Sequence, residues 1–292
     1  MKITLLFLLM ILVGCGSTEQ KKTVPPLISD SLTALESFNT GGELPIEQAK
    51  LDFQALELSV ELFPDTQSID ATAQLSLSVL SPLTSILLDF DRRFNVKTVT
   101  VNQHTIELTQ VTNTRGKLAI ALPFTLTSGD TAEVSIQYQG QPHKAKKAPW
   151  DGGFVWQKTP SGANWIATAV QGEGCDLIWP CIDHPSAEPK QVDLYIKVPK
   201  PLVAASNGVL LSVENGELHR TFHWQSNVAN NNYAISLNVA PYQLLQTDYQ
   251  SRYGNTIDLQ YYHLPEHKLK AEQLFTEFPL MLDFFEQVIG PY

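Results

Sequence analysis

The feature that most constrains this chain is a long series of short segments in which apolar and polar residues alternate. The first spans residues 51–62 and the second spans residues 73–79. A period of two places one apolar face of a β-strand toward a core. The sequence therefore predicts a mostly β protein, with a large antiparallel sandwich or saddle of sheets over about residues 50–250. Further runs of this kind, bounded by Gly, Pro, Asn or Asp, are 85–90, 96–101, 117–122, 132–138, 193–198 and 233–239.

The period changes near residue 265, where apolar residues begin to recur every three or four positions. This pattern predicts an amphipathic helix with one wide apolar stripe. Pro279 should kink the helix or split it in two. The stripe must be buried against something, and the chain stops at Tyr292, so we expect its partner to lie beyond this sequence. The stripe consists of Ala271, Leu274, Phe275, Phe278, Met281, Leu282, Phe285, Val288 and Ile289.

Charge and motifs exclude several classes of function. The 292 residues contain 20 Lys and Arg against 30 Asp and Glu, a net charge of −10. This is the wrong sign for a surface that follows nucleic-acid phosphates, so we expect no nucleic-acid partner. The sequence contains no Gly-rich phosphate loop and no G-x-S-x-G motif.

The first residues predict export and lipid anchoring. Met1 and Lys2 precede an apolar run, and Leu12-Val13-Gly14-Cys15 resembles the lipobox of bacterial lipoproteins. We expect a signal peptide at 1–14, a lipid on Cys15 that binds the membrane, and a flexible tether at 15–48. Because no Asp follows the cysteine, the expected location is the outer membrane, on its periplasmic or cell-surface side. The alternative is an ordinary signal or anchor helix with an incidental cysteine.

The least generic stretch lies between residues 150 and 190. There Gln171 precedes Trp179-Pro180-Cys181-Ile182-Asp183-His184-Pro185, and the chain ends on a helical segment followed by Gly290-Pro291-Tyr292. Together with the preceding strands, this order resembles the N-terminal domain of the M1 family of zinc aminopeptidases, over about residues 50–292. One position departs from the family, because Asp176 stands where Arg is frequent.

The resemblance implies a domain organisation and a substrate-binding residue. Residues 49–252 would form the aminopeptidase N-like β-domain, and residues 253–292 would begin an incomplete catalytic domain. Gln171 would approach the free amine of a peptide, since an amide oxygen accepts hydrogen bonds from an ammonium group. Glu173 is a weaker candidate that adds negative charge nearby. Alternatively, Gln171 merely pairs with backbone at a sheet edge.

The catalytic motifs of the family are not found in these residues. Its members bind zinc with H-E-x-x-H and the substrate amine with G-x-M-E-N. None of the seven His residues begins H-E-x-x-H, and the three Met residues do not fit G-x-M-E-N. We therefore assign no catalytic residue and no metal ligand here, and expect zinc only in the complete family enzyme.

Two other patterns resemble metal sites. His263-Leu264-Pro265-Glu266-His267 has the spelling H-x-x-E-H, but Pro265 belongs only in the first turn of a helix. His263 should then lie before the helix, in a strand-to-helix turn with exposed histidines. Cys175, Cys181 and His184 do not match a zinc spacing. In an exported protein a disulfide between Cys175 and Cys181, or two buried thiols, is the alternative.

These observations support two hypotheses. In the first, the chain is the lipid-anchored N-terminal portion of an M1 zinc aminopeptidase, inactive alone, with peptide N-termini and the missing catalytic domain as partners. In the second, it is a non-catalytic, lipid-anchored β-domain that binds peptide or protein. A generic cell-surface sandwich without peptidase ancestry is a third alternative.

Overall fold

The computed structural model describes residues 42–148 and 150–292. The predicted signal peptide, the predicted lipidation site Cys15 and the predicted tether up to residue 41 therefore lie outside the described residues. The largest sheet consists of β1 (Leu51–Phe63), β2 (Ser68–Val79), β4 (Asn95–Val101), β5 (His104–Ile106), β8 (Thr131–Gly140), β11 (Gln191–Pro199), β13 (Val209–Asn215) and β14 (His219–Ser226). The strand order is β13-β14-β11-β1-β2-β8-β4-β5, and β1 and β11 run parallel.

Two smaller sheets share a core with the large one. A three-stranded sheet has the order β3 (Leu83–Asp89), β7 (Lys117–Leu126) and β6 (Val111–Thr114). A four-stranded sheet has the order β12 (Val203–Ala205), β15 (Asn238–Ala240), β10 (Asn164–Ala169) and β9 (Gly153–Lys158). Their inward side chains join those of the large sheet in one hydrophobic cluster. Short 3-10 turns connect strands: η1 (Gln48–Lys50), η2 (Leu108–Gln110), η3 (Cys175–Leu177) and η4 (Asn232–Ala234).

The predicted mostly β architecture is confirmed, and the alternation explains it. Along β1, Leu56, Leu58 and Val60 are buried, while Glu57 and Ser59 between them reach the other face. The same alternation in β2 makes one face of the sheet apolar and the other polar. Burial of the apolar face in the shared core is the main source of stability.

The strand predicted at 233–239 is wrong for most of its length. Residues 232–234 form η4, and β15 begins only at Asn238. The buried side-chain amide of Asn232 donates hydrogen bonds to the carbonyl oxygens of Ile182 (2.8 Å) and His184 (3.2 Å). These bonds attach the segment to another loop, which period-two alternation does not reveal.

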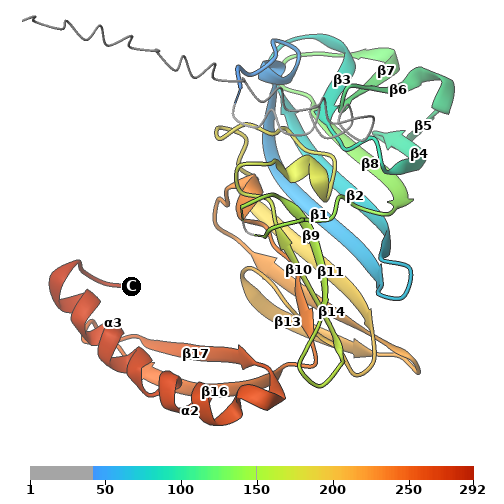
Figure 1. Ribbon diagram of the computed structural model, residues 1–292. Coiled ribbons are helices and arrows are strands. Elements are labelled where there is room, and N and C mark those ends of the chain that lie inside the picture. Colours follow the sequence, from blue (N-terminus) through green and yellow to red (C-terminus); the bar gives the residue numbers. More distant parts are fainter. Residues whose placement is uncertain (1–41, 149) are drawn as a thin grey trace, which may run out of the picture.

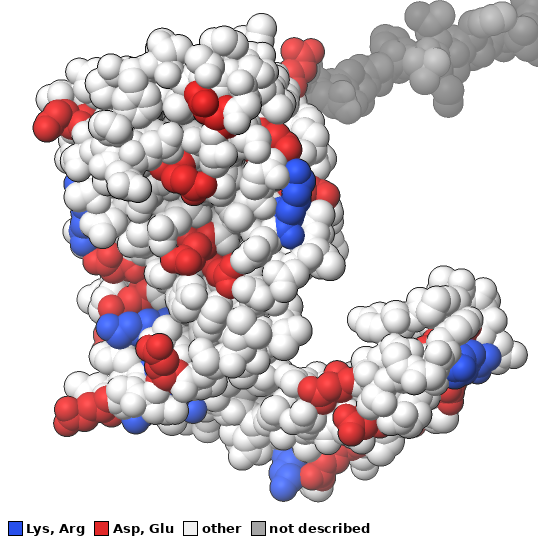
Figure 2. Space-filling model, turned by 180° about the vertical axis from the view of Figure 1, so that it is seen from behind, with Lys and Arg blue, Asp and Glu red and all other residues white. Residues whose placement is uncertain are grey.

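Residues 243–292 form an arm that stands away from the three sheets (Figures 1 and 2). The helix is divided at Thr276, three residues before Pro279. A proline ring clashes with the carbonyl four residues earlier, here that of Phe275, so the break precedes the proline. The arm contains the hairpin β16 (Gln243–Gln250) and β17 (Thr256–His263), the 3-10 turn η5 (Pro265–His267), α2 (Lys268–Phe275) and α3 (Glu277–Val288).

Helix α3 turns a polar side chain inward and apolar side chains outward. The carboxylate of Glu286, 1% exposed, accepts hydrogen bonds from the Tyr249 hydroxyl (3.0 Å), the Ser251 hydroxyl and the Arg252 backbone N–H (3.0 Å). Burial raises the pKa of Glu286, but these hydrogen bonds outweigh it and leave the pKa lowered. The ionised carboxylate thereby attaches α3 to the hairpin.

The apolar stripe is largely exposed in the described chain. Phe285 is 44% exposed, Val288 64% and Ile289 79%, whereas Ala271 is the buried apolar residue of α2. Phe275 and Phe278 are half-buried against Tyr261 of β17. An exposed apolar surface of this kind marks an interaction site. Among residues 42–148 and 150–292, no helix is long and apolar enough to cross a membrane.

Glu286→Ala should loosen α3 on the hairpin, because the Ser251 hydroxyl and the Arg252 backbone N–H lose their acceptor, and Tyr249 keeps only Asp283. We expect chymotrypsin to cleave within residues 277–292 at least about tenfold faster, since cleavage follows local opening. Limited proteolysis followed by mass spectrometry measures this rate. Gln287→Ala, exposed on the same helix, is the control. Equal cleavage rates for the two variants would show that Glu286 does not hold the helix.

Candidate functional site

The candidate site is the turn that follows β10, at residues 170–174. The backbone N–H groups of Glu173 and Gly174 both donate to the Val170 carbonyl, at 3.0 Å each. Gly174 has φ +112°, and a Cβ there would lie 2.2 Å from the Asp176 carboxylate, so this position requires glycine. Gln171 lies in the turn rather than in a strand, and its side chain is exposed.

The carboxylate of Glu173 is half-buried and incompletely bonded. Its side chain packs so closely on Gly152 that a Cβ there would lie 2.2 Å from Glu173 Cγ. Oε2 of Glu173 is buried and has no hydrogen-bond partner among the described residues. Burial, with help from the nearby Asp151, raises the pKa of Glu173, although hydrogen bonding to the Gly152 backbone opposes the shift. The group is an acceptor with spare capacity.

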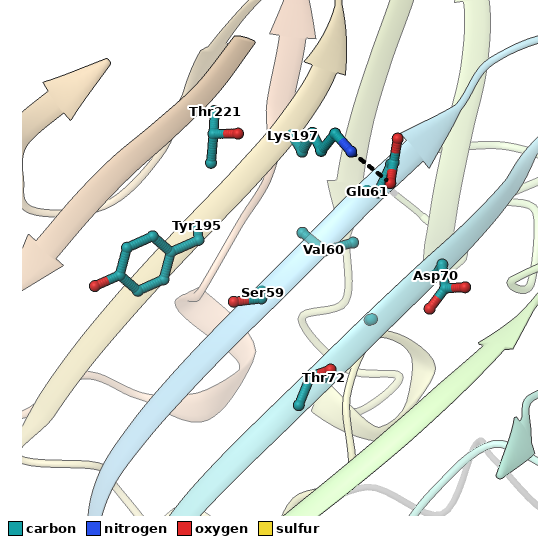
Figure 3. Close-up of a pocket in the computed structure, with 9 residues that line it drawn as sticks. Ser59, Val60, Glu61, Asp70, Thr72, Tyr195, Lys197 and Thr221 are labelled. Atoms are coloured by element: carbon teal, nitrogen blue, oxygen red, sulfur yellow. Dashed lines mark hydrogen bonds and ion pairs between the residues drawn. The ribbon is translucent and has the colours of Figure 1, made fainter. Parts of the chain in front are cut away.

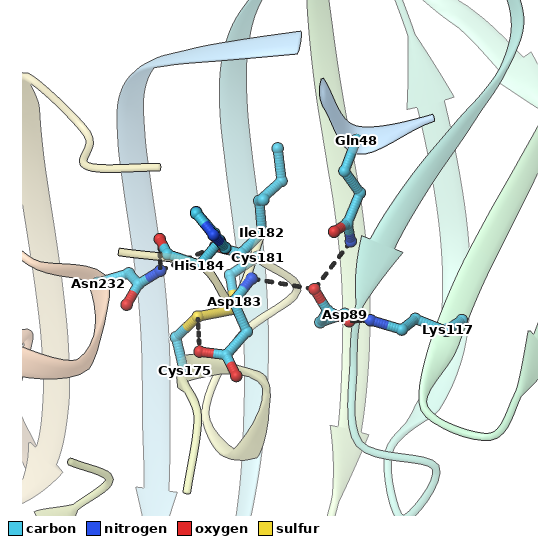
Figure 4. The surroundings of a disulfide bond; sticks show 9 residues. All are labelled: Gln48, Asp89, Lys117, Cys175, Cys181, Ile182, Asp183, His184 and Asn232. Atoms are coloured by element: carbon cyan, nitrogen blue, oxygen red, sulfur yellow. Dashed lines mark hydrogen bonds and ion pairs between the residues drawn. A yellow bond between two sulfur atoms is a disulfide. The ribbon is translucent and has the colours of Figure 1, made fainter. Parts of the chain in front are cut away.

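The Trp-Pro-Cys segment is cross-linked to Cys175, the residue that follows this turn (Figure 4). A disulfide joins Cys175 to Cys181, with 6.2 Å between their Cα atoms. Cys181 also exchanges two backbone hydrogen bonds with Asp89 at the end of β3, at 2.7 and 2.9 Å. The Asp89 carboxylate accepts hydrogen bonds from the Gln48 amide (2.8 Å) and the Asp183 backbone N–H (2.9 Å), and it pairs with Lys117.

The same segment is packed against the large sheet. Trp179 is fully buried and its ring lies 5.7 Å from that of Phe53 on β1. The buried Tyr138 hydroxyl on β8 donates a 2.7 Å hydrogen bond to the Ile178 carbonyl. The segment is therefore fixed on two sheets, and the loop that carries Gln171 and Glu173 leads into it at Cys175.

Asp176 is a buried carboxyl among other carboxyls. It is 4% exposed, and its Oδ1 has no hydrogen-bond partner in the described structure. Burial raises its pKa well above the usual value, and the negative charges of Asp183, Asp89 and Asp91 raise it further. The family resemblance would place an arginine here. This chain has Asp176 instead, and its raised pKa favours the protonated, uncharged carboxyl.

The H-x-x-E-H residues do not converge. His263 ends β17 and is 5% exposed, so the expectation of an exposed histidine is wrong for this residue. Glu266 accepts a 2.9 Å hydrogen bond from the Ser161 backbone N–H of the β9–β10 turn. Bonding to Ser161 lowers the pKa of Glu266 to about 2. His267 is exposed on the following 3-10 turn.

The Cys175, Cys181 and His184 set also lacks free ligands. Both sulfur atoms are in the disulfide, and the His184 Nδ1 lies 2.7 Å from the Ser186 hydroxyl. Within residues 42–148 and 150–292, no group of His, Cys, Asp and Glu side chains is arranged to hold a metal ion. Zinc therefore has no fitting ligand set in the described part of this chain.

Two contributors to the site escaped sequence reasoning. Asp89 lies more than 90 residues from Asp183, yet its carboxylate binds the Asp183 backbone. Gly152 makes room for the Glu173 side chain. The adjacent Gly152-Gly153 pair was a signal of close backbone approach, but nothing in the sequence indicates which segment approaches.

Comparisons with known proteins agree with this architecture. Residues 51–233 match the sequence profile of the Peptidase M1 N-terminal domain. No curated protein matches the chain at a significant level.

Several crystal structures share the fold. A mutant two-domain M1 zinc metallopeptidase bound to L-arginine is similar with a TM-score of 0.67 and 23% identity. A mutant M1 zinc metallopeptidase from Deinococcus radiodurans bound to a Tyr-Ser-Ala substrate gives 0.66 and 23%, and the same organism's M1 zinc metallopeptidase gives 0.65 and 22%. Each match covers 84% of this chain and 55% of the other, so the chain spans about half the length of these proteins.

Asp176→Asn should stabilise the protein increasingly as the pH rises. A carboxyl whose pKa is raised by folding contributes stability that is complete at low pH and lost as the pH climbs above its unfolded value of 3.8. We expect the variant to gain about 1–3 kcal/mol at pH 8 and little at pH 4. Thermal unfolding at both pH values measures the difference. The exposed Asp65→Asn is the control, and a pH-independent effect of Asp176→Asn would contradict the assignment.

Proposed function

Because the chain belongs to the M1 peptidase family through the N-terminal domain at residues 51–233, we propose that it binds the N-terminal end of the substrate in a zinc metallo-aminopeptidase. Such an enzyme removes N-terminal residues from peptides. The observation that carries the proposal is the turn after β10, where an exposed amide and an incompletely bonded carboxylate lie two residues apart on a loop that leads into the disulfide-bonded Cys175.

The proposed ligand of this turn is a free α-amine. An α-amino group has a pKa of about 8, so it is largely an ammonium ion at neutral pH. Gln171 supplies an exposed amide oxygen that can accept a hydrogen bond from the ammonium group. Glu173, whose buried Oε2 accepts no hydrogen bond from the described residues, adds negative charge nearby, and an ammonium group bound at the turn would favour its ionised form. Gln171 is the principal ligand in this proposal, and Glu173 assists it.

The chemical step belongs to residues outside this sequence. The 292 residues contain neither H-E-x-x-H nor G-x-M-E-N. The described side chains offer zinc no site. The chain alone is therefore proposed to be catalytically incompetent.

The proposed partner of the arm is the metallopeptidase catalytic domain. Residues 253–292 lie beyond the matched family domain, and the match leaves nearly half of the length of the similar structures uncovered. Glu286 holds α3 with its apolar side chains outward, which suits packing against further apolar elements. In this proposal residues 49–252 are the β-domain, and 253–292 begin the next domain.

The N-terminal residues suggest where this activity takes place. We propose that residues 1–14 direct export and that a lipid on Cys15 holds the protein at the outer membrane, with 15–48 as a tether. The rival proposal is a non-catalytic lipoprotein whose β-domain binds peptide or protein. DNA downstream of the Tyr292 codon distinguishes the two: an in-frame or frame-shifted continuation encoding G-x-M-E-N and H-E-x-x-H supports the enzyme.

The purified chain with added zinc should not hydrolyse amino-acid anilides, because it supplies neither zinc ligands nor a general base. Release of nitroaniline measures the activity, and a chelator shows whether any activity depends on metal. Chelator-sensitive turnover by the chain would overturn the proposed incompetence.

A peptide with a free amine should bind the turn, and its N-acetylated form should not. In spectra of the isotope-labelled chain titrated with Tyr-Ser-Ala, we expect amide shifts at residues 171–174. Acetylation removes the positive charge, so these shifts should fall by at least about fivefold. Gln171→Ala combined with Glu173→Gln should abolish them, whereas Gln157→Ala, exposed on β9, should not. Equal shifts from both peptides would contradict an amine site.

A further inference from the structure

A depression on the polar face of the large sheet is not used by the proposed peptidase function. It has a volume of about 330 Å³ and lies over β1, β2, β11 and β14. The proposed amine site is elsewhere, because it follows β10, which is a strand of the four-stranded sheet. The size is within the range of small-molecule pockets.

The strand register creates the depression. Ser59 on β1 lies opposite Thr72 on β2 and opposite Tyr195 on β11. Ser59 and Thr72 are short, whereas their neighbours Tyr195, Lys197 and Glu61 are long. Figure 3 shows the two short side chains with Tyr195 on one side and Asp70 on the other. The long side chains form walls around a floor of small ones.

The aromatic wall is held in place before any ligand arrives. The Tyr195 ring stacks on the cross-strand His223, with ring centroids 4.1 Å apart and planes inclined by 17°. His223 Nε2 lies 2.7 Å from Asp193 Oδ1. Asp193 also accepts hydrogen bonds from the amides of Gln191 and Gln225, at 2.8 Å each. A fixed ring loses little conformational entropy when a ligand packs on it.

The charges of the depression are balanced within the protein. Lys197 Nζ lies 3.0 Å from Glu61 Oε2, and Asp70 Oδ2 lies 2.8 Å from Lys97 Nζ. Each of these two lining carboxylates therefore has an ammonium partner, while the negative charges of Glu57, Asp193 and Glu214 act on Tyr195. The site thus offers no net positive charge to attract an anion. The hydroxyls of Ser59, Thr72 and Thr221 both donate and accept hydrogen bonds. This set suits a neutral ligand that is rich in hydroxyl groups.

We propose that the depression binds a neutral pyranose ring of a glycan. One face of a pyranose presents C–H groups, which pack on an aromatic ring such as Tyr195. Its vicinal hydroxyls both donate and accept hydrogen bonds. They can therefore donate to the Glu61 carboxylate, accept from the Lys197 ammonium group and do either with the hydroxyl side chains. A charged peptide terminus would leave one member of an ion pair unsatisfied, which disfavours it.

Titration of the purified chain with maltotriose, cellotriose and N,N′,N″-triacetylchitotriose tests the proposal. We expect saturation-transfer NMR and calorimetry to detect at least one of them with a Kd of about 1 mM or below. Tyr195→Ala should weaken that binding at least about tenfold. Thr72→Trp keeps Tyr195 but fills the floor, and should abolish binding. Tyr292→Ala removes an exposed tyrosine on the arm and is the matched control.

Circular dichroism and thermal unfolding establish that each variant is folded. Absence of binding by all three sugars at about 10 mM overturns the proposal. So does binding that Tyr195→Ala and Thr72→Trp leave unchanged, or binding of a charged peptide but of no sugar at this face. None of these outcomes affects the amine site, because the peptide titration reports on residues 171–174.

Discussion

The candidate site at residues 170–174 depends on the pair of backbone hydrogen bonds between Asp89 and Cys181. This pair fastens the Trp-Pro-Cys segment to the end of β3, while Trp179 packs on Phe53 of the large sheet. The Asp89 carboxylate strengthens this attachment, because it accepts hydrogen bonds from the Asp183 backbone N–H and from the Gln48 amide. Because a buried carboxylate is costly without partners, these bonds and Lys117 are what allow Asp89 to be 5% exposed. The turn with Gln171 and Glu173 leads into this fixed segment at Cys175, which is bonded to Cys181.

The protein uses buried carboxylates in two opposite ways. Glu286 has several donors and stays ionised, so it orders α3 on the hairpin. Asp176 has carboxyl neighbours and an unpartnered oxygen, so its proton is held more tightly. Both groups are nearly inaccessible, and burial raises the pKa of each. Hydrogen-bond donors outweigh this effect at Glu286, whereas the neighbouring carboxylates add to it at Asp176. Near the proposed amine-binding turn, the tightly held proton of Asp176 therefore limits the negative charge.

The two faces of the large sheet have different roles. The apolar face joins the core, and the polar face carries paired charges and a fixed tyrosine. The arm contrasts with this arrangement, because its polar anchor is inside and its apolar side chains are outside. Together with the family membership, this supports the proposal that the arm packs on a further domain, whereas the sheet face is open to small ligands.

The sequence by itself determined the β-architecture and the division of the last helix, because alternation and a proline act locally. It also indicated the Trp-Pro-Cys segment and the family to which it belongs. Tertiary structure alone decided that Asp89 binds that segment, that Gly152 admits Glu173, that residues 233–237 are not a strand, and that the apolar stripe faces outward. These features depend on contacts between residues distant in the sequence, and a periodic pattern states which face is apolar but not what covers it.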